Sequence, residues 1–293
     1  MGPGRLVGRT AGELAALVRR GDASPVDVVA AHLARIEELE PTIRAFRRVR
    51  AEEALREAEA LASRDGLADL PLPGIPVAVK ENVAVAGEEV RHGSAATPAE
   101  PAPEDDEVVR RVRAAGGIVV GITRMPELGL WGTTDGPWGI TRNPWDPRRS
   151  PGGSSGGNAA AVAAGAVPLA LGNDGLGSIR IPAACCGVVG MKPGTGLLPP
   201  AASASAWAGF TEHGPFAVTV ADAALLLSVL AGRADLRDLP LAGLPVAVGG
   251  EGVGQGEDRL RDLGIHPGHG ERRPDAHRDP QRGRRGREVP ELV

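Results

Sequence analysis

Two glycine-rich stretches lie close together in the middle of the chain. Residues 151–158 read Pro-Gly-Gly-Ser-Ser-Gly-Gly-Asn, and residues 174–182 read Asp-Gly-Leu-Gly-Ser-Ile-Arg-Ile-Pro. Each stretch holds a serine among glycines, Ser154 in the first and Ser178 in the second. Glycine lets the backbone approach a ligand closely, and it adopts φ values that other residues avoid. The pattern therefore favours an exposed nucleophile surrounded by backbone N–H donors over a packed core.

A lysine at position 80 is the second informative feature. The chain has 33 basic residues, yet only Lys80 and Lys192 are lysines. Unlike arginine, a lysine side chain can lose its proton within the working pH range of a protein. Lys80 follows the apolar run of residues 75–79, which is typical of a buried strand. Because burial disfavours the ammonium form, Lys80 is a candidate general base for a serine nucleophile.

These residues predict a serine-based site. Ser178 is the expected nucleophile, Lys80 the base, and Ser154 a relay that passes the proton between them. Backbone N–H groups of the same loop are expected to hold an oxyanion, namely those of Gly175, Leu176, Gly177 and Ser178. A Ser-His-Asp arrangement stays open only through His92 or His213, both expected in loops. A phosphate-binding loop is excluded, because no Gly-Lys-Ser/Thr follows the glycines.

The order of predicted elements indicates an α/β fold with a largely parallel or mixed sheet. Short apolar runs predict three buried strands, at residues 75–79, 118–122 and 167–171. Caps and apolar periodicity predict six helices, at residues 11–20, from 25 onward, 51–64, 104–115, 158–165 and 220–231. We expect three regions: an N-terminal helical region at 1–66 that packs on the core, a core at 67–245, and a tail at 246–293. The tail is rich in Arg, Gly and Pro, and we expect it to be disordered.

Composition limits the partners and the location of the protein. The net charge of −4 is mild and implies no acidic or basic partner. Cys185 and Cys186 are adjacent and the only cysteines, so we expect no disulfide and treat both as core residues. No apolar leader and no run of about 18 apolar residues is present. We therefore expect a soluble cytoplasmic protein that binds neither nucleic acid nor a membrane, and a homodimer stays open.

From about residue 10 to 245 the sequence resembles the amidase signature family. Three blocks of motifs carry the resemblance: residues 152–157, residues 174–184, and Cys-Gly-Val-Val-Gly-Met-Lys-Pro at residues 186–193. Gly-Ile-Pro-Val-Ala-Val-Lys-Glu-Asn at residues 74–82 is similar to the lysine motif of the family. The resemblance implies the amidase-signature fold, a mixed central β-sheet flanked by helices. Family members continue well past residue 250, so we expect the C-terminal part to be missing, through truncation or a frame shift after about residue 245.

The resemblance implies amide hydrolysis through a serine acyl-enzyme with a Ser-Ser-Lys triad. It places the nucleophile at Ser178, the base at Lys80, and the relay at Ser154, which the family holds with a cis peptide. It also implies supporting residues: Ser155 as a hydroxyl of the same loop, and Asp174 and Arg180 as a brace of the nucleophile loop. Apart from the resemblance, we expect Trp131 to be mainly a packing residue and keep Met125 or Trp131 as a candidate contact with the substrate. The implied partner is a small-molecule amide, and no metal or organic cofactor is implied.

Some positions depart from the family pattern and leave alternatives open. The family carries Gly-Gly before the nucleophile, where this chain has Leu176-Gly177, and we expect the Leu176 side chain to narrow the acyl pocket. A second candidate is the A subunit of a glutamyl-tRNA(Gln)-type amidotransferase, although such subunits carry glutamine at the position of Ile181. A third is a truncated amidase-like protein that has lost catalysis.

Overall fold

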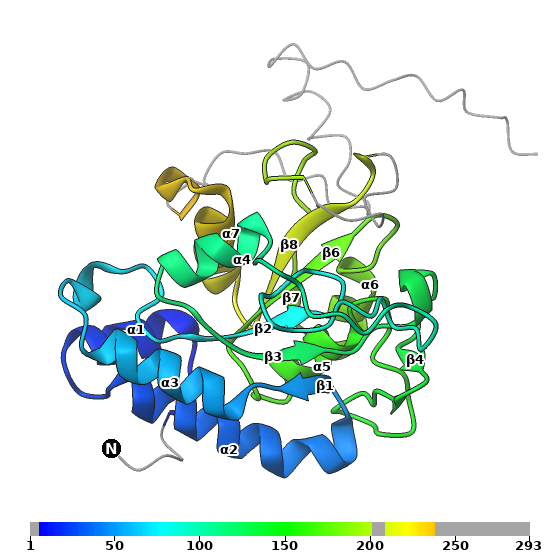
Figure 1. Ribbon diagram of the computed structural model, residues 1–293, viewed down its shortest axis with the longest axis horizontal. Helices are drawn as coiled ribbons and strands as arrows, with labels where there is room; N and C mark the ends of the chain where they lie inside the picture. The colour runs from blue at the N-terminus through cyan, green and yellow to red at the C-terminus, as the bar shows by residue number, and fades with distance from the viewer. Residues whose placement is uncertain (1–5, 201–208, 238–293) are drawn as a thin grey trace, which may run out of the picture. The chain divides into compact units, whose positions relative to one another are not determined.

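A mixed sheet forms the centre of the computed structural model, which describes residues 6–200 and 209–237 (Figure 1). These residues belong to one compact unit, Met1–Leu239. The sheet has the strand order β1-β3-β2-β6-β8-β7. Its strands are β1 Phe46–Val49, β2 Pro76–Lys80, β3 Ile118–Thr123, β6 Leu169–Asp174, β7 Val189–Gly190 and β8 Glu212–Ala217. The predicted tail at residues 246–293 lies outside the described residues.

The three central strands of the sheet are parallel to one another. β2 pairs in parallel with β3 on one side and with β6 on the other, whereas β1, β7 and β8 pair antiparallel with their neighbours. All three central strands are buried along their full length, as expected for parallel strands covered on both faces. A separate two-stranded ribbon pairs β4, Asp135–Gly136, with β5, Gly139–Ile140.

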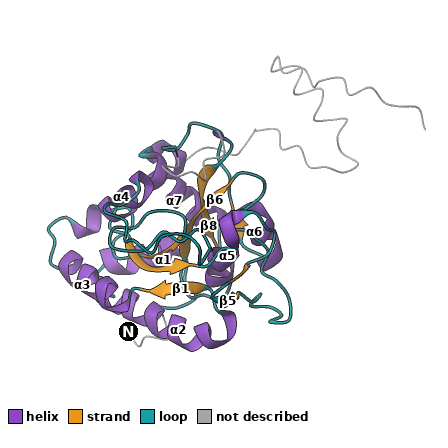
Figure 2. Ribbon diagram, turned by 45° about the vertical axis from the view of Figure 1, so that its right-hand side comes forward, coloured by secondary structure: helices purple, strands orange, loops and turns teal. Residues whose placement is uncertain are grey.

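Helices cover both faces of this sheet (Figure 2). The helices are α1 Ala11–Arg19, α2 Pro25–Ile43, α3 Ala51–Ala62, α4 Glu107–Ala114, α5 Gly156–Ala163, α6 Arg180–Cys186 and α7 Val220–Ala231. One apolar core lies mainly between the sheet and α1, α4 and α7. The other lies between the opposite face and α2, α3, α5 and α6. The α/β class and the mixed sheet flanked by helices are thus confirmed.

Local signals explain why several helices begin where predicted. Thr10 and Glu13 form a capping box at the start of α1, and Ser24 and Asp27 form another at the start of α2. Thr219 caps α7 by accepting a hydrogen bond from the Asp222 amide. Both boxes satisfy backbone N–H groups that have no partner within the helix.

Several elements were not predicted, among them β1, α6 and β8, and one residue lies elsewhere than expected. Strand β1 lies within residues 1–66, α6 directly follows Ser178, and β8 contains Gly214-Pro215, a pair that argues against a strand. His213 therefore lies in strand β8, so its predicted place in a loop was wrong. Gly214 fits the strand because any Cβ there would overlap the carbonyl of Met191.

The parallel pairing sets the place of the site. In register, Val79 of β2 lies beside Leu171 of β6, so both strands end at the same edge of the sheet. Lys80 is the last residue of β2 and Asp174 the last of β6. Side chains at the carboxyl ends of adjacent parallel strands converge, as at the ligand sites of other open α/β sheets.

Close packing of α5 against the backbone gives a testable prediction. A Cβ at Gly157 would lie 2.6 Å from the carbonyl oxygen of Ala45 and 2.7 Å from the backbone nitrogen of Arg124. Alanine favours a helix over glycine by about 1 kcal/mol. Against this gain, overpacking a side chain against fixed backbone costs about 1–3 kcal/mol or more. Because the cost exceeds the gain, we expect Gly157→Ala to lower the free energy of unfolding measured in urea. Gly12→Ala in α1 is the matched control: its nearest contact is 3.6 Å away, so no loss is expected.

Candidate active site

Lys80 is enclosed completely and contacts one of the two motif serines. Its side chain has 0% exposure, and its Nζ lies within hydrogen-bond distance of Ser154 Oγ, at 2.8 Å, and of Asn173 Oδ1, at 2.8 Å. Burial lowers the pKa of Lys80 from 10.5 to about 7, and the nearby negative charge of Asp174 opposes part of that shift. Near neutral pH a large share of Lys80 is therefore an uncharged amine that can accept a proton.

The loop that carries Ser154 is tied to the segment of Ser178. The peptide bond between Gly153 and Ser154 is cis. The backbone N–H of Ser155 donates to the carbonyl of Ser178 at 3.1 Å, and Ser155 Oγ donates to the carbonyl of Asn173 at 3.3 Å. These two bonds hold the two glycine-rich stretches side by side.

Ser154 and Ser178 line one small cavity. Ser178 is partly buried, whereas Ser154 is 2% exposed. The other lining residues are Asn82, Leu128, Gly129, Asn173, Gly175 and Thr211. Among the described residues, the hydroxyl of Ser178 has no hydrogen-bond partner, so the structure brings Lys80 and Ser154 into contact and places Ser178 on the same cavity without a bond to Ser154.

Asp174 organises the backbone around Ser178. Its carboxylate accepts from the backbone N–H groups of Gly177 at 2.6 Å and Ile179 at 3.1 Å. It also accepts two bonds from the Arg180 guanidinium, at 2.9 and 3.0 Å. Burial alone would raise the pKa of Asp174, but the hydrogen bonds from Arg180 and the backbone lower it to about 2. The carboxylate is thus ionised throughout the neutral range and fixes the turn that presents Ser178.

This geometry corrects the predicted set of oxyanion donors. The N–H of Gly177 is bonded to Asp174 and points to that carboxylate, so Gly177 is withdrawn from the set. The amides of Gly175 and Leu176 have no such bond among the described residues. The Leu176 side chain is 74% exposed and does not line this cavity, and that it narrows the acyl pocket stays a prediction.

Comparison with known proteins identifies the family. The model of the amidase family matches residues 27–248. The chain belongs to the amidase family. It is 47% identical over 199 residues to a Mycobacterium tuberculosis protein named as an amidase, AmiB2. That alignment covers 67% of this chain and 43% of the other protein. It is 42% identical over 229 residues to an acylamidase of Rhodococcus erythropolis, covering 76% and 47% of the two chains.

Solved structures agree with this family. The peptide amidase of Stenotrophomonas maltophilia is 34% identical, with a TM-score of 0.69 over 79% of this chain and 50% of that one. The chain therefore spans about half the length of the curated relatives and solved amidases that it matches.

Met125 and Trp131, the predicted substrate contacts, lie in different surroundings. Met125 is 2% exposed, whereas Trp131 is 65% exposed, and neither lines the cavity of the two serines. Their contact with an amide substrate stays a prediction. Sequence reasoning did not single out Asn82 and Thr211, which do line that cavity; the end of β2 and the start of β8 bring them there.

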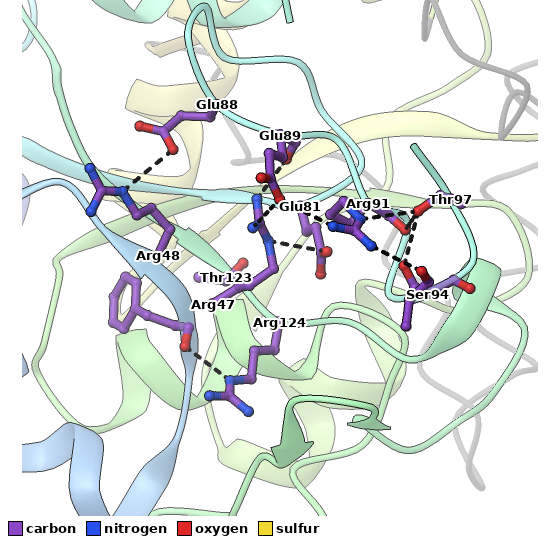
Figure 3. A network of polar contacts seen from close by, with 12 residues as sticks. Arg47, Arg48, Glu81, Glu88, Glu89, Arg91, Ser94, Thr97, Thr123 and Arg124 are labelled. Atoms are coloured by element: carbon purple, nitrogen blue, oxygen red, sulfur yellow. Dashed lines mark hydrogen bonds and ion pairs between the residues drawn. The ribbon is translucent and has the colours of Figure 1, made fainter. Parts of the chain in front are cut away.

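The carboxylate of Glu81, the residue directly after Lys80, belongs to a network of charged side chains (Figure 3). Glu81 is buried, and its Oε1 lies 3.1 Å from Nε of Arg47, which also pairs with Glu89 at 3.4 Å. Burial raises the pKa of Glu81 to about 7, against the opposing charges of Arg47 and Arg91. Among the described residues no carboxylate pairs with Lys80, which helps to keep its amine uncharged.

Neither histidine of the Ser-His-Asp alternative lies at the cavity. His213 is 1% exposed and its Nε2 lies 3.8 Å from Asp106 Oδ2, too far for a hydrogen bond. Burial lowers the pKa of His213, while Asp106 opposes the shift. Burial also lowers the pKa of His92, which is partly buried in a loop. Neither imidazole lines the cavity of Ser154 and Ser178.

The remaining predictions concern metals, membranes and cysteines. In the part of the chain that the structure describes, no three His, Cys, Asp or Glu side chains gather as metal ligands would. Over the same residues, no helix is both long and apolar enough to span a bilayer. Cys185 and Cys186 are both free thiols, but Cys185 is exposed, so its assignment to the core was wrong.

Loss of the Asp174 brace gives a second prediction. Asp174→Asn offers one acceptor oxygen in place of two, so the bonds to Arg180 and the backbone cannot all persist. We expect about 1–3 kcal/mol less free energy of unfolding in urea, with slower reaction of Ser178. Asp146→Asn is the matched control, because Asp146 also pairs with two arginines but those pairs face water. Equal stability of Asp174→Asn and the unaltered chain would contradict the bracing role.

Proposed function

We propose that this chain hydrolyses a carboxylic amide to an acid and ammonia or an amine, through an acyl-enzyme on Ser178. The observation that carries the proposal is the 2.8 Å contact between Lys80 Nζ and Ser154 Oγ, at a cavity that Ser178 also lines. A serine hydroxyl needs a base to become nucleophilic, and a buried lysine with a pKa near 7 supplies one at neutral pH.

In this scheme the proton passes from Ser178 to Ser154 and from Ser154 to Lys80, with both serines on one cavity and Ser154 in contact with Lys80. The amine of Lys80 takes the proton of Ser154, and Ser154 in turn takes the proton of Ser178. Ser178 Oγ then bonds to the amide carbon, and the carbonyl oxygen becomes an oxyanion near the N–H groups of Gly175 and Leu176. When the oxyanion collapses, the carbon–nitrogen bond breaks and the relay returns a proton to the leaving nitrogen.

Water completes the cycle by the same route. The relay removes a proton from water, the resulting hydroxide adds to the ester carbon, and the carbon–oxygen bond to Ser178 breaks. Ser178 regains its proton and the acid leaves. In this scheme Ser155, Asp174 and Arg180 position the loop, and no cofactor is required.

The names of the relatives support amides as substrates. An acylamidase and a peptide amidase are among the proteins similar to this chain. The cavity that the described residues form is small, so its shape alone favours no particular amide. We propose a small-molecule amide as the substrate class.

Trapping with hydroxylamine tests the acyl-enzyme. The purified chain is incubated with aliphatic, aryl and peptide amides, with and without hydroxylamine, and the acid and hydroxamate products are quantified by mass spectrometry. An acyl-enzyme divides its acyl group between water and hydroxylamine, so hydroxamate should form at the expense of acid. Acid release without any hydroxamate would argue for direct attack of water, and no turnover of any amide would contradict hydrolysis by this chain.

A further inference from the structure

Two asparagine side chains lie beside Lys80 at the ends of neighbouring parallel strands. Asn173 belongs to β6, and Asn82 follows the last residue of β2 by two positions. They are 4% and 6% exposed, and both line the cavity of the two serines. Both amide groups therefore lie where they can act on the amine of Lys80, the proposed base.

The hydrogen bonds give the amide of Asn173 one orientation. Its Oδ1 accepts from Lys80 Nζ at 2.8 Å, and its Nδ2 donates to Asn82 Oδ1 at 2.9 Å. The Nδ2 of Asn82 reaches back to Asn173 Oδ1 at 3.4 Å. The contact with Lys80 and the pairing with Asn82 together hold Asn173 with its oxygen toward the lysine and its NH₂ group toward Asn82.

This orientation decides what the amine of Lys80 can do. An uncharged amine has two N–H donors and one lone pair. The Asn173 oxygen can only accept, so it takes one N–H and leaves the lone pair for the proton of Ser154. With the amide turned over, its NH₂ group would face the amine and compete for that lone pair. We propose that Asn173, locked by Asn82, is a positioning residue that holds Lys80 as an amine with its lone pair toward Ser154; this rests on the proposed function.

The charge of the acceptor matters as much as its direction. An amide oxygen accepts a hydrogen bond without a full negative charge, whereas a carboxylate at this place would stabilise the ammonium form. The strands and helices packed against β2 bring few other charges near: β3 and α5 contain no charged side chain. The titratable groups buried in or beside the other contacting elements are Asp174 of β6, Glu212 and His213 of β8, Asp106 facing His213, His32 of α2, and Glu81 next to Lys80.

Asn173→Asp is the direct test. The rate at which a fluorophosphonate labels Ser178 is measured from about pH 6 to about pH 10 in the unaltered chain and in the variant. We expect the midpoint of the profile to rise by about one pH unit or more in the variant, with labelling at pH 7 slower by about fivefold or more. A folded Asn173→Asp protein with an unchanged midpoint would overturn the proposal.

Asn82 supplies a second test, which is read at the high-pH plateau, where Lys80 is uncharged. Asn82→Leu removes the acceptor that holds the Asn173 NH₂ group, so we expect slower labelling at the high-pH plateau. Asn82→Asp keeps an acceptor oxygen there and should restore at least half of the lost plateau rate. If Asn82 only stabilised the fold, Asn82→Asp would not restore the labelling rate that Asn82→Leu loses. A plateau rate in Asn82→Leu equal to that of the unaltered chain would overturn the proposal.

The two proposals fail in different ways. If the unaltered chain is not labelled at Ser178, the nucleophile itself is wrong. If Ser178 is labelled but the midpoint of its pH profile is the same in Asn173→Asp and in the unaltered chain, only the positioning role of Asn173 is wrong.

Discussion

Replacing Ser178 with alanine is expected to reduce amide hydrolysis by about 10⁴-fold or more and to abolish hydroxamate formation. The alanine has no oxygen to bond to the amide carbon, and water alone would have to attack. The Ser178 side chain donates no hydrogen bond within the described fold, so the variant should unfold at the same urea concentration as the unaltered chain. Product analysis by mass spectrometry together with a urea titration measures both quantities.

Ser155→Ala is the matched control for that experiment. Ser155 lies in the other glycine-rich loop and donates to the carbonyl of Asn173 at 3.3 Å, but it does not line the cavity. We expect it to lose far less activity than Ser178→Ala, because only one supporting hydrogen bond is removed. Hydroxamate formation that persists in Ser178→Ala and disappears in Ser155→Ala would exchange the roles of the two serines.

Replacing Lys80 with methionine is expected to lower the rate of amide hydrolysis by about 10²–10⁴-fold. Methionine fills a similar volume in the buried site but cannot take the proton of Ser154. Lys192→Met is the control, because Lys192 bonds the carbonyl of Pro193 and does not line the cavity. Turnover that survives in Lys80→Met and is lost in Lys192→Met would contradict the assignment of the base.

The same variant should change how stability depends on pH. The pKa of Lys80 is about 7 in the folded chain and 10.5 in the unfolded one, so between these values the unfolded state binds more protons. The free energy of unfolding of the unaltered chain should therefore rise with pH from about 7 to about 10.5, relative to Lys80→Met. The full change amounts to about 4–5 kcal/mol. Urea titrations of both proteins across this range measure the difference, and a constant difference would contradict a depressed lysine pKa.

Much of the fold follows from local signals in the sequence. The capping boxes at Thr10 and Ser24 mark two helix starts, and the apolar runs at residues 75–79 and 118–122 match β2 and β3 closely. Such signals depend on neighbours in the chain, so sequence alone carries them. Strand β8 gave no such signal, because Gly214 and Pro215 are typical of turns; its pairing with β6 supplies the missing reason.

The candidate site likewise has parts that the sequence predicts and parts that only the structure reveals. The isolated lysine after a buried strand predicted a base, and the glycines around Ser154 and Ser178 predicted their loops. The amide pair of Asn82 and Asn173 could not be predicted, because asparagine after a strand is common and only the parallel register of β2 and β6 brings the two together. The bond from the Gly177 amide to Asp174 likewise depends on the path of the turn.

Mapping of a fluorophosphonate adduct tests the central claim most directly. The folded chain is labelled, digested and analysed by tandem mass spectrometry, and the labelling rate is followed through neutral pH. The proposed mechanism predicts one adduct on Ser178, with a half-maximal rate near the pKa of Lys80 of about 7 and very slow labelling of Lys80→Met. An adduct on a different residue, or labelling of Ser178 that is equally fast in Lys80→Met, would contradict it.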